Sequence, residues 1–137
     1  MRTNTRTLHV EWGDCDPTGI VYFPRYFEWF DACTAALFES VGFPKQVLLR
    51  TFDIVGMPMV EARAKFIIPS QFDDEAVVET YVSQFRRSSF DVHHRLLKEG
   101  QLAVEGFETR VWTGRDPENP SKFKSRPIPD EVKVRLG

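Results

Sequence analysis

The sequence predicts an α+β domain in which a curved antiparallel sheet wraps around one long helix. Three patterns indicate this fold class: an alternating segment near the N-terminus, one long stretch of helical periodicity, and four later strand-like segments. A chain of 137 residues has the usual length of one domain, so residues 1–137 are assigned to a single domain. With 42% hydrophobic residues, the chain can form an ordinary core.

The first two elements are a strand and the long helix. Residues Thr5–Trp12 alternate between polar and apolar side chains, and the sequence GDCDPTG then breaks the strand. The helix is expected from about Pro24 to Val41, because proline suits a first helical turn and Gly42 can adopt a left-handed cap. Pro44 then disfavours continuation. Residues at steps of three and four form a mostly apolar stripe: Phe27, Phe30, Thr34, Leu37 and Val41.

Beta structure is predicted for most of the remaining chain. A connection without a clear pattern, residues 46–53, comes first. The Glu99-Gly100 pair suggests a hairpin turn, so the sheet is expected to be antiparallel. The polar tail is interpreted as a surface loop with a short helix after Pro129. Four segments are predicted as strands: Met59–Ile68, Ala76–Arg87, Ser89–Lys98 and Gln101–Thr113.

Charge and cysteine content argue against several classes of protein. A net charge of −2 disfavours nucleic acid as the main partner. Two cysteines form neither a disulfide framework nor a metal cluster, which indicates free thiols in a cytoplasmic protein. His93 and His94 are neighbours on a strand and face opposite sides, so no metal site is expected. No signal peptide and no apolar window of about 20 residues are found, so no membrane partner is expected.

The order of elements and the sequence GDCDPTGIVYFPRYFEWFDA together resemble the hot-dog-fold acyl-CoA thioesterases, in particular the 4-hydroxybenzoyl-CoA thioesterase family. The shared signature is an Asp-x-Asp turn after the first strand, a Gly-hydrophobic-Val-aromatic run, a proline, and a helix with an aspartate in its second turn. IVGMPMVEARAKF and FRRSSFDV match as well, so the likeness spans most of the chain. It implies a hot-dog domain that hydrolyses acyl-CoA without a further cofactor. It also implies a homodimer or homotetramer, because a single hot-dog domain has an open sheet edge and shares its site between subunits.

The resemblance assigns the catalytic carboxylate to Asp16, as a nucleophile or as a general base on water. Asp14 is expected to shape the turn and Cys15 to pack, and a turn role remains the alternative for Asp16. The oxyanion is expected to bind backbone N–H groups at the helix start, which the resemblance places at Phe23. Gly19 is expected to permit close approach of the acyl group. Pro24 lacks an N–H and cannot be the donor, so it is assigned to the substrate-binding surface.

Asp31 and Met57 are the candidate residues for the acyl group. Asp31 lies beside the apolar stripe of the helix, and the resemblance implies that it binds a ring hydroxyl; a solvated helix edge is the alternative. Met57 stands where the resemblance leads us to expect a small polar residue, so a plain aromatic or aliphatic acyl group would also suit this position.

The phosphates of coenzyme A need local cations in a chain of negative net charge. One candidate cluster is Arg86 and Arg87, with Ser88 and Ser89 beside them. The other lies in the tail and contains Lys122, Lys124 and Arg126. Solvated surface is the alternative for both clusters.

These residues favour an acyl-CoA thioesterase acting on an aromatic acyl group such as 4-hydroxybenzoyl or benzoyl. An aliphatic acyl-CoA or acyl-carrier-protein thioesterase is the first alternative, although the run VYFPRYF lacks the histidine that such relatives often carry. A non-catalytic acyl-CoA-binding hot-dog protein would be expected to have lost the motif carboxylate, and Asp16 is present. A hydratase of the same fold would need a histidine that this chain does not place suitably.

Overall fold

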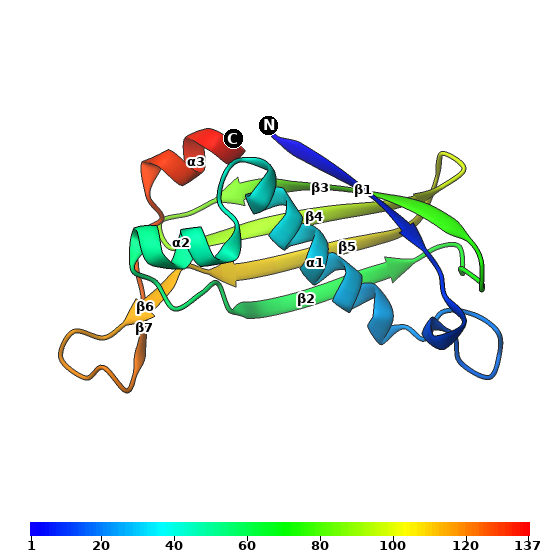
Figure 1. The fold of residues 1–137 in the computed structure, drawn as a ribbon, viewed down its shortest axis with the longest axis horizontal. Coiled ribbons are helices and arrows are strands. Elements are labelled where there is room, and N and C mark those ends of the chain that lie inside the picture. Colours follow the sequence, from blue (N-terminus) through cyan, green and yellow to red (C-terminus); the bar gives the residue numbers. More distant parts are fainter.

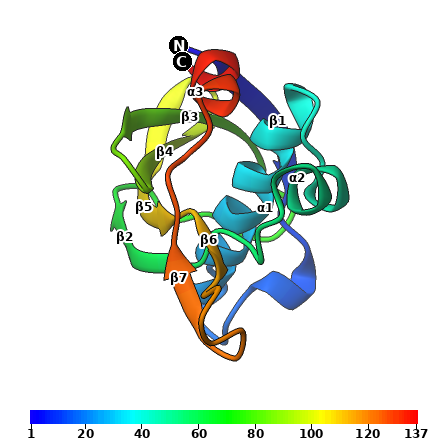
Figure 2. The same ribbon diagram turned by 90° about the vertical axis from the view of Figure 1, so that its left-hand side faces the viewer.

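The computed structural model describes residues 1–137. A five-stranded antiparallel sheet in the order β1-β3-β4-β5-β2 curves around helix α1, which lies against its concave side (Figures 1 and 2). The predicted α+β class and the arrangement of sheet around helix are therefore confirmed. In chain order the elements are β1 (Thr3–His9), the 3₁₀ turn η1 (Trp12–Asp14), α1 (Pro24–Ser40), α2 (Lys45–Phe52), β2 (Met59–Phe66), β3 (Glu75–Phe85), β4 (Ser89–Lys98), β5 (Gln101–Val111), β6 (Thr113–Arg115), β7 (Phe123–Ser125) and α3 (Asp130–Leu136).

Helix α1 forms where the periodicity predicts it. Its N-terminal residue is Pro24, and it ends at Ser40, after which Gly42 adopts a left-handed φ of +92°. Two residues of the predicted stripe, Phe27 and Val41, are only partly buried. The face of α1 that packs on the sheet includes other side chains in their place. The fully buried residues of α1 are Tyr26, Phe30, Cys33, Thr34, Leu37 and Phe38.

The strands alternate between a face that packs on α1 and an outer face. On β4 the inward side chains are Phe90, Val92, His94 and Leu96, all nearly inaccessible to solvent. His93 points to the opposite face, as expected for its neighbour in a strand. Two groups of apolar side chains fill the space under α1, one near each end of the helix.

Two predictions about local structure in the first half of the chain were wrong. Residues 46–53 are not an unpatterned connection but belong largely to α2, which buries Leu48 against the core. Eight residues are too few for a helical period to stand out, and α2 is held by packing rather than by propensity. The first strand ends at His9 instead of Trp12, because Val10 bonds to the loop residues Asp73 and Asp74 and Trp12 enters the 3₁₀ turn with its side chain 73% exposed.

The tail is more structured than a loop. Residues of the expected surface loop form β7, which pairs with β6, and this hairpin projects from one end of the sheet (Figure 1). The short helix predicted after Pro129 is confirmed as α3, whose Val132 and Leu136 are buried. The predicted strand Ser89–Lys98 coincides with β4, and the other three later strands differ from the predicted ones by one or two residues at their ends. No helix of this chain has the length and apolarity needed to cross a membrane.

Strand β2 lies at one edge of the sheet and pairs only with β5. Almost all of its residues are exposed, although several are apolar. Val60 is 62% exposed and Phe66 is 51% exposed, and Ile67 follows directly with 54%. This edge therefore combines unpaired backbone groups with exposed apolar side chains.

Candidate active site

The loop before α1 is built by its two aspartates, which have different surroundings. Asp14 accepts a hydrogen bond from the backbone N–H of Glu11 at 2.9 Å and lies 3.4 Å from Nε of Arg25. Both carboxylate oxygens of Asp14 thus hold the turn, which confirms its predicted structural role. Cys15 is half-buried and packs against the core, with its thiol 3.8 Å from the carbonyl of Glu11.

Asp16 lies at the start of a tight turn and keeps one oxygen free. Its Oδ1 accepts hydrogen bonds from the backbone N–H and the hydroxyl of Thr18, the first at 2.8 Å. Gly19 closes the turn with a left-handed φ of +86° and donates its N–H to the carbonyl of Asp16 at 2.9 Å. Oδ2 of Asp16 has no hydrogen bond within the chain, and the side chain is only partly buried. The turn therefore presents a carboxylate that is oriented by one oxygen and open at the other.

The N-terminus of α1 follows this turn directly. Phe23 precedes Pro24 with helical φ and ψ of −53° and −32°, and its N–H makes none of the backbone hydrogen bonds outside the regular elements. Pro24 has no N–H, so Phe23 supplies the first backbone donor at this helix end. The positive end of the helix dipole lies at the same place. The helix end can therefore stabilise negative charge on a bound group, next to the free carboxylate oxygen of Asp16.

A cavity of about 430 Å³ lies at the other half of α1. Asp31 and Met57 both line it, as does Lys45, and most of its wall is apolar. Asp16 and Phe23 do not line it and precede Asp31 by two helical turns or more. The segment before α1 lies at the opposite end of the molecule from α2 (Figure 1). The remaining residues around the cavity are Ala32, Thr34, Ala35, Phe38, Phe43, Leu48, Leu49, Val55, Gly56, Pro58, Arg110 and Phe123.

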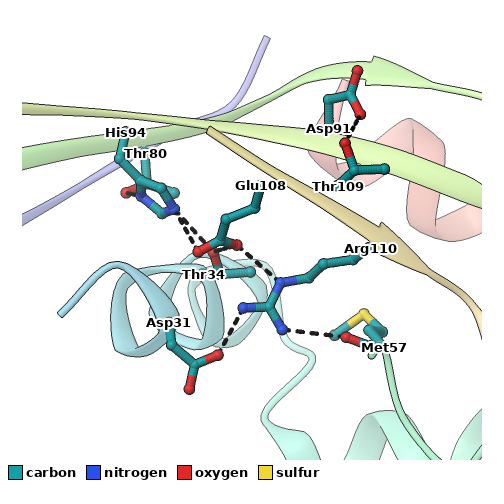
Figure 3. Close-up of polar contacts among 9 residues, drawn as sticks. All are labelled: Asp31, Thr34, Met57, Thr80, Asp91, His94, Glu108, Thr109 and Arg110. Atoms are coloured by element: carbon teal, nitrogen blue, oxygen red, sulfur yellow. Dashed lines mark hydrogen bonds and ion pairs between the residues drawn. The ribbon is translucent and has the colours of Figure 1, made fainter. Parts of the chain in front are cut away.

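A buried polar network extends from this cavity into the core (Figure 3). Arg110 of β5 donates to Asp31 Oδ1 at 2.6 Å and, through Nε, to Glu108 Oε1 at 2.9 Å. Glu108 is nearly inaccessible, and it also accepts from Thr34 Oγ1 at 2.7 Å and lies 3.0 Å from His94 Nε2. The other ring nitrogen of His94 is hydrogen-bonded to Thr80 at 2.8 Å. The network joins α1, β3, β4 and β5.

Charges in this network stabilise one another. Burial, the largest influence, raises the pKa of the Glu108 carboxyl, but the hydrogen bond from His94 and the charges of His94 and Arg110 outweigh it and lower this pKa. Burial alone would lower the pKa of Arg110, yet the carboxylates of Glu108 and Asp31 raise it. Arg110 and Glu108 are therefore a paired cation and anion inside the protein.

The sequence analysis missed this network, although β5 carries a signal for it. The residues of β5 that face the core are Val104, Gly106, Glu108 and Arg110. Two opposite charges two positions apart lie on one face of a strand, and on the core side they must be paired. Which face of β5 meets the helix could be seen only after the strand register was known.

The candidate residues for coenzyme A lie at one end of the sheet. Arg86 donates to both carboxylate oxygens of Asp91, at 2.6 and 3.1 Å, and to Ser89 Oγ at 3.2 Å. These bonds to Asp91 raise the pKa of Arg86. The side chains of Arg87 and Lys124 are exposed and free of ion pairs. The backbone carbonyl of Arg87 accepts from Ile128 N–H at 2.8 Å, so the structure places the turn after β3 beside the tail.

Comparison with known proteins agrees with this architecture. The family model described as thioesterase-like superfamily matches residues 10–136. The 4-hydroxybenzoyl-CoA thioesterase of Pseudomonas sp. strain CBS-3 is 36% identical over 124 residues, which cover 85% of this chain and 87% of that protein.

Solved structures of acyl-CoA thioesterases superpose on this chain over nearly its whole length. An aspartate-to-asparagine mutant of 4-hydroxybenzoyl-CoA thioesterase complexed with 4-hydroxybenzoyl-CoA superposes with a TM-score of 0.89 at 30% identity and covers 100% of both chains. A gentisyl-coenzyme A thioesterase superposes with a TM-score of 0.80 at 31% identity, covering 97% of this chain and 98% of that one. The chain belongs to the thioesterase-like superfamily, with the hot-dog fold of its acyl-CoA thioesterases.

Proposed function

We propose that the protein is an acyl-CoA thioesterase that hydrolyses an aromatic acyl-CoA, such as 4-hydroxybenzoyl- or benzoyl-CoA, to the free acid and coenzyme A. The observation that carries this proposal is the half-free carboxylate of Asp16 directly before a helix whose first N–H, that of Phe23, is unpaired. The 36% identity to 4-hydroxybenzoyl-CoA thioesterase supports the aromatic acyl group.

In the proposed reaction, Asp16 acts on the thioester carbonyl in one of two ways. Its free oxygen attacks the carbonyl carbon to form a mixed anhydride that water then hydrolyses, or it takes a proton from water as the water attacks. In both cases the C–S bond breaks and the thiol of coenzyme A leaves with a proton. The N–H of Phe23 stabilises the oxyanion, a role in which one donor contributes about a hundredfold or more in rate. Asp16 and Phe23 supply this chemistry, so the proposal includes neither a metal nor a cofactor.

Gly19 and Pro24 give the acyl group access in this scheme. A Cβ at Gly19 would meet no atom within 4 Å, so the space beside this residue is open. Pro24 adds an apolar ring to the same end of the helix, next to the donor of Phe23. The thioester carbonyl would lie between Asp16 and this helix end.

A complete site requires a second copy of the chain. The cavity with Asp31 and Met57 does not include Asp16, which supports a site that a second copy completes. The exposed edge of β2, with Val60 and Phe66, is suited to pair with the same edge of another copy. We therefore propose a homodimer, or a tetramer of two such dimers, in which Asp16 of one copy meets the cavity of the other.

The two ends of the substrate have separate binding groups in this proposal. Asp31 accepts a hydrogen bond from a ring hydroxyl, and Met57 forms part of the apolar wall. The exposed cations Arg87 and Lys124, with Arg86 and Ser89 close to the first, bind the phosphates of coenzyme A. The apolar cavity wall also favours a second candidate substrate, an aliphatic acyl-CoA or acyl-carrier-protein thioester. The two free thiols support a cytoplasmic location.

Thiol release from purified protein tests this proposal, with benzoyl-, 4-hydroxybenzoyl-, phenylacetyl- and fatty acyl-CoA as substrates. Asp16→Asn should lose roughly a hundredfold or more in rate, because the amide neither attacks nor takes a proton but still accepts the hydrogen bond from Thr18. Glu79→Gln, which changes a carboxylate paired with Arg95 on the outer face of the sheet, is the control and should keep most of the activity. An Asp16→Asn protein with full activity rules out the mechanism. If the native protein cleaves no thioester, the proposed function changes from a thioesterase to a non-catalytic acyl-CoA-binding protein.

A further inference from the structure

We propose that Arg110 is a positioning residue of the acyl cavity. It fixes the carboxylate of Asp31 and the backbone of Met57, and so presents one open Asp31 oxygen to a hydrogen-bond donor at the far end of the acyl group. Arg110 acts through these two residues and is not itself a catalytic group. The inference rests on the proposed thioesterase function, and it adds the residue by which the cavity distinguishes a hydroxylated acyl group from a plain one.

The guanidinium of Arg110 uses each of its three nitrogens for a different partner (Figure 3). Nη2 donates to Asp31 Oδ1 at 2.6 Å, Nη1 donates to the carbonyl of Met57 at 3.2 Å, and Nε donates to Glu108 Oε1 at 2.9 Å. These partners lie on α1, on the segment before β2, and on β5. Because the guanidinium is planar and its donors form a rigid fork, the three contacts fix the relative positions of these elements.

The base of this fork cannot move freely. The side chain of Glu108 is 3% exposed, and besides Arg110 it is held by Thr34 and His94. His94 is fully buried and anchored in turn by Thr80. The Arg110 side chain is 10% exposed. Its guanidinium is held on the core side by Glu108 and reaches the cavity on its other side.

Asp31 has the opposite character and depends on Arg110 for its orientation. Its side chain is 66% exposed, and the bond from Arg110 is the only one that it makes within the chain. Oδ1 is occupied by this bond, whereas Oδ2 has no partner and can accept a hydrogen bond in the cavity. Without the fork, an exposed aspartate would sample several rotamers, and a ligand hydroxyl would have to select one of them at a cost in affinity.

Met57 is fixed by the same residue through its backbone. Its carbonyl accepts from Arg110, and the next carbonyl, that of Pro58, accepts from Val111 N–H at 3.0 Å. The wall of the cavity opposite α1 is thereby tied to β5. Arg110 thus fixes the Asp31 acceptor relative to this wall, which the bond between Val111 and Pro58 holds to β5 even without Arg110.

The experiment measures affinity for 4-hydroxybenzoyl-CoA and benzoyl-CoA by calorimetry, in an Asp16→Asn background so that neither compound is consumed. We expect the parent to prefer the hydroxylated compound about tenfold, the size of one hydrogen bond to a charged group. Arg110→Lys keeps the positive charge beside Glu108 but lacks the fork, and it should reduce this preference to about threefold or less while affinity for benzoyl-CoA stays nearly unchanged. Asp31→Asn should reduce the preference similarly, and the double variant should lose no more than either single variant.

Arg95→Lys is the matched control, because Arg95 pairs with Glu79 on the outer face of the sheet. It should leave the preference intact. If Arg110→Lys weakens binding of both compounds equally, Arg110 is only structural and the inference is wrong. A parent protein without preference for the hydroxylated compound also overturns it. Loss of thiol release in the native protein with the preference retained would reject the proposed function and leave the role of Arg110 standing.

Discussion

Gly106 of β5 lies directly beneath the ring of Phe30, so that a Cβ built at residue 106 would stand 2.5 Å from Cε2 of that ring. Gly106 is also paired with His94 across the sheet, and the Phe30 ring stacks on His94 with 4.7 Å between ring centroids. The missing side chain at residue 106 therefore allows α1 to approach the sheet and to cover the histidine of the buried network.

Substituting Gly106 by alanine should destabilise the protein by about 1–3 kcal/mol, because Phe30 is 2% exposed and has no room to move away. Gly13→Ala is the control, since a Cβ at residue 13 meets no atom within 4 Å. Urea unfolding at one fixed protein concentration measures both variants. Equal stability of Gly106→Ala and the native protein would show that α1 adjusts its position over the sheet.

Thr34→Val tests the buried network without changing side-chain volume much. The hydroxyl of Thr34 donates to Glu108 Oε1 at 2.7 Å, and both residues are inaccessible to solvent. Its removal leaves a buried carboxylate with one donor fewer, so the free energy of unfolding should fall by about 1–3 kcal/mol. Thr109→Val is the matched control: it removes a 2.8 Å bond to Asp91 on the outer face, where water can replace the hydroxyl. A larger loss of stability in the control than in Thr34→Val would contradict the importance assigned to the network.

The parts of the structure that the sequence predicted well have local signals. The stripe through Phe30 and Leu37 marks α1, and Pro24 and Gly42 mark its ends, because helix periodicity and caps depend on neighbours in sequence. The turn around Asp14 and Asp16 could be recognised for the same reason.

The cavity of Asp31 and Met57 could be predicted only in part: the sequence named these two residues as candidates, but the cavity itself depends on contacts between distant residues. Asp31 and Arg110 are 79 positions apart, and Thr34 and Glu108 are 74 apart. The sequence does not show whether a charged residue of a strand faces solvent or the core. Glu108 and Arg110 could therefore not be grouped with Asp31 before the fold was known. Helix α2, which closes the cavity, is likewise specified by the packing of Leu48 rather than by a local pattern.

Acid should remove the stabilising effect of Asp74 at the end of β1 and β3. A hydrogen bond from Lys98 at 2.8 Å, followed by one from the Gln71 N–H, lowers the pKa of Asp74 below its ordinary value of 3.8. Since the pKa is lower in the folded state, the carboxylate stabilises the fold above the unfolded-state pKa of about 4, and this effect is lost as the pH falls through the folded-state pKa.

The difference in unfolding free energy between the native protein and Asp74→Asn should therefore be about 0.5 kcal/mol at neutral pH and shrink toward zero as the pH falls through the lowered pKa of Asp74. Glu99→Gln removes the same charge from the same region, where Glu99 makes no side-chain hydrogen bond, and it is the control for the change in net charge. A constant difference across the acid range would assign the effect to something other than ionisation of Asp74.

The edge of β2 is predicted to carry the subunit contact. Val60 is 62% exposed on this edge, and a two-fold axis that passes between two such edges would bring the same region of two copies together. Val60→Lys places two like charges in that contact, so the dissociation constant should rise by roughly tenfold or more. Thiol release should fall in parallel, because Asp16 of one copy would separate from the cavity of the other. Val134→Lys on α3, where Val134 is 78% exposed, introduces the same charge away from the edge and should change neither quantity. Sedimentation velocity over a range of concentrations measures the association, and a Val60→Lys protein that stays associated and active would move the contact to another surface.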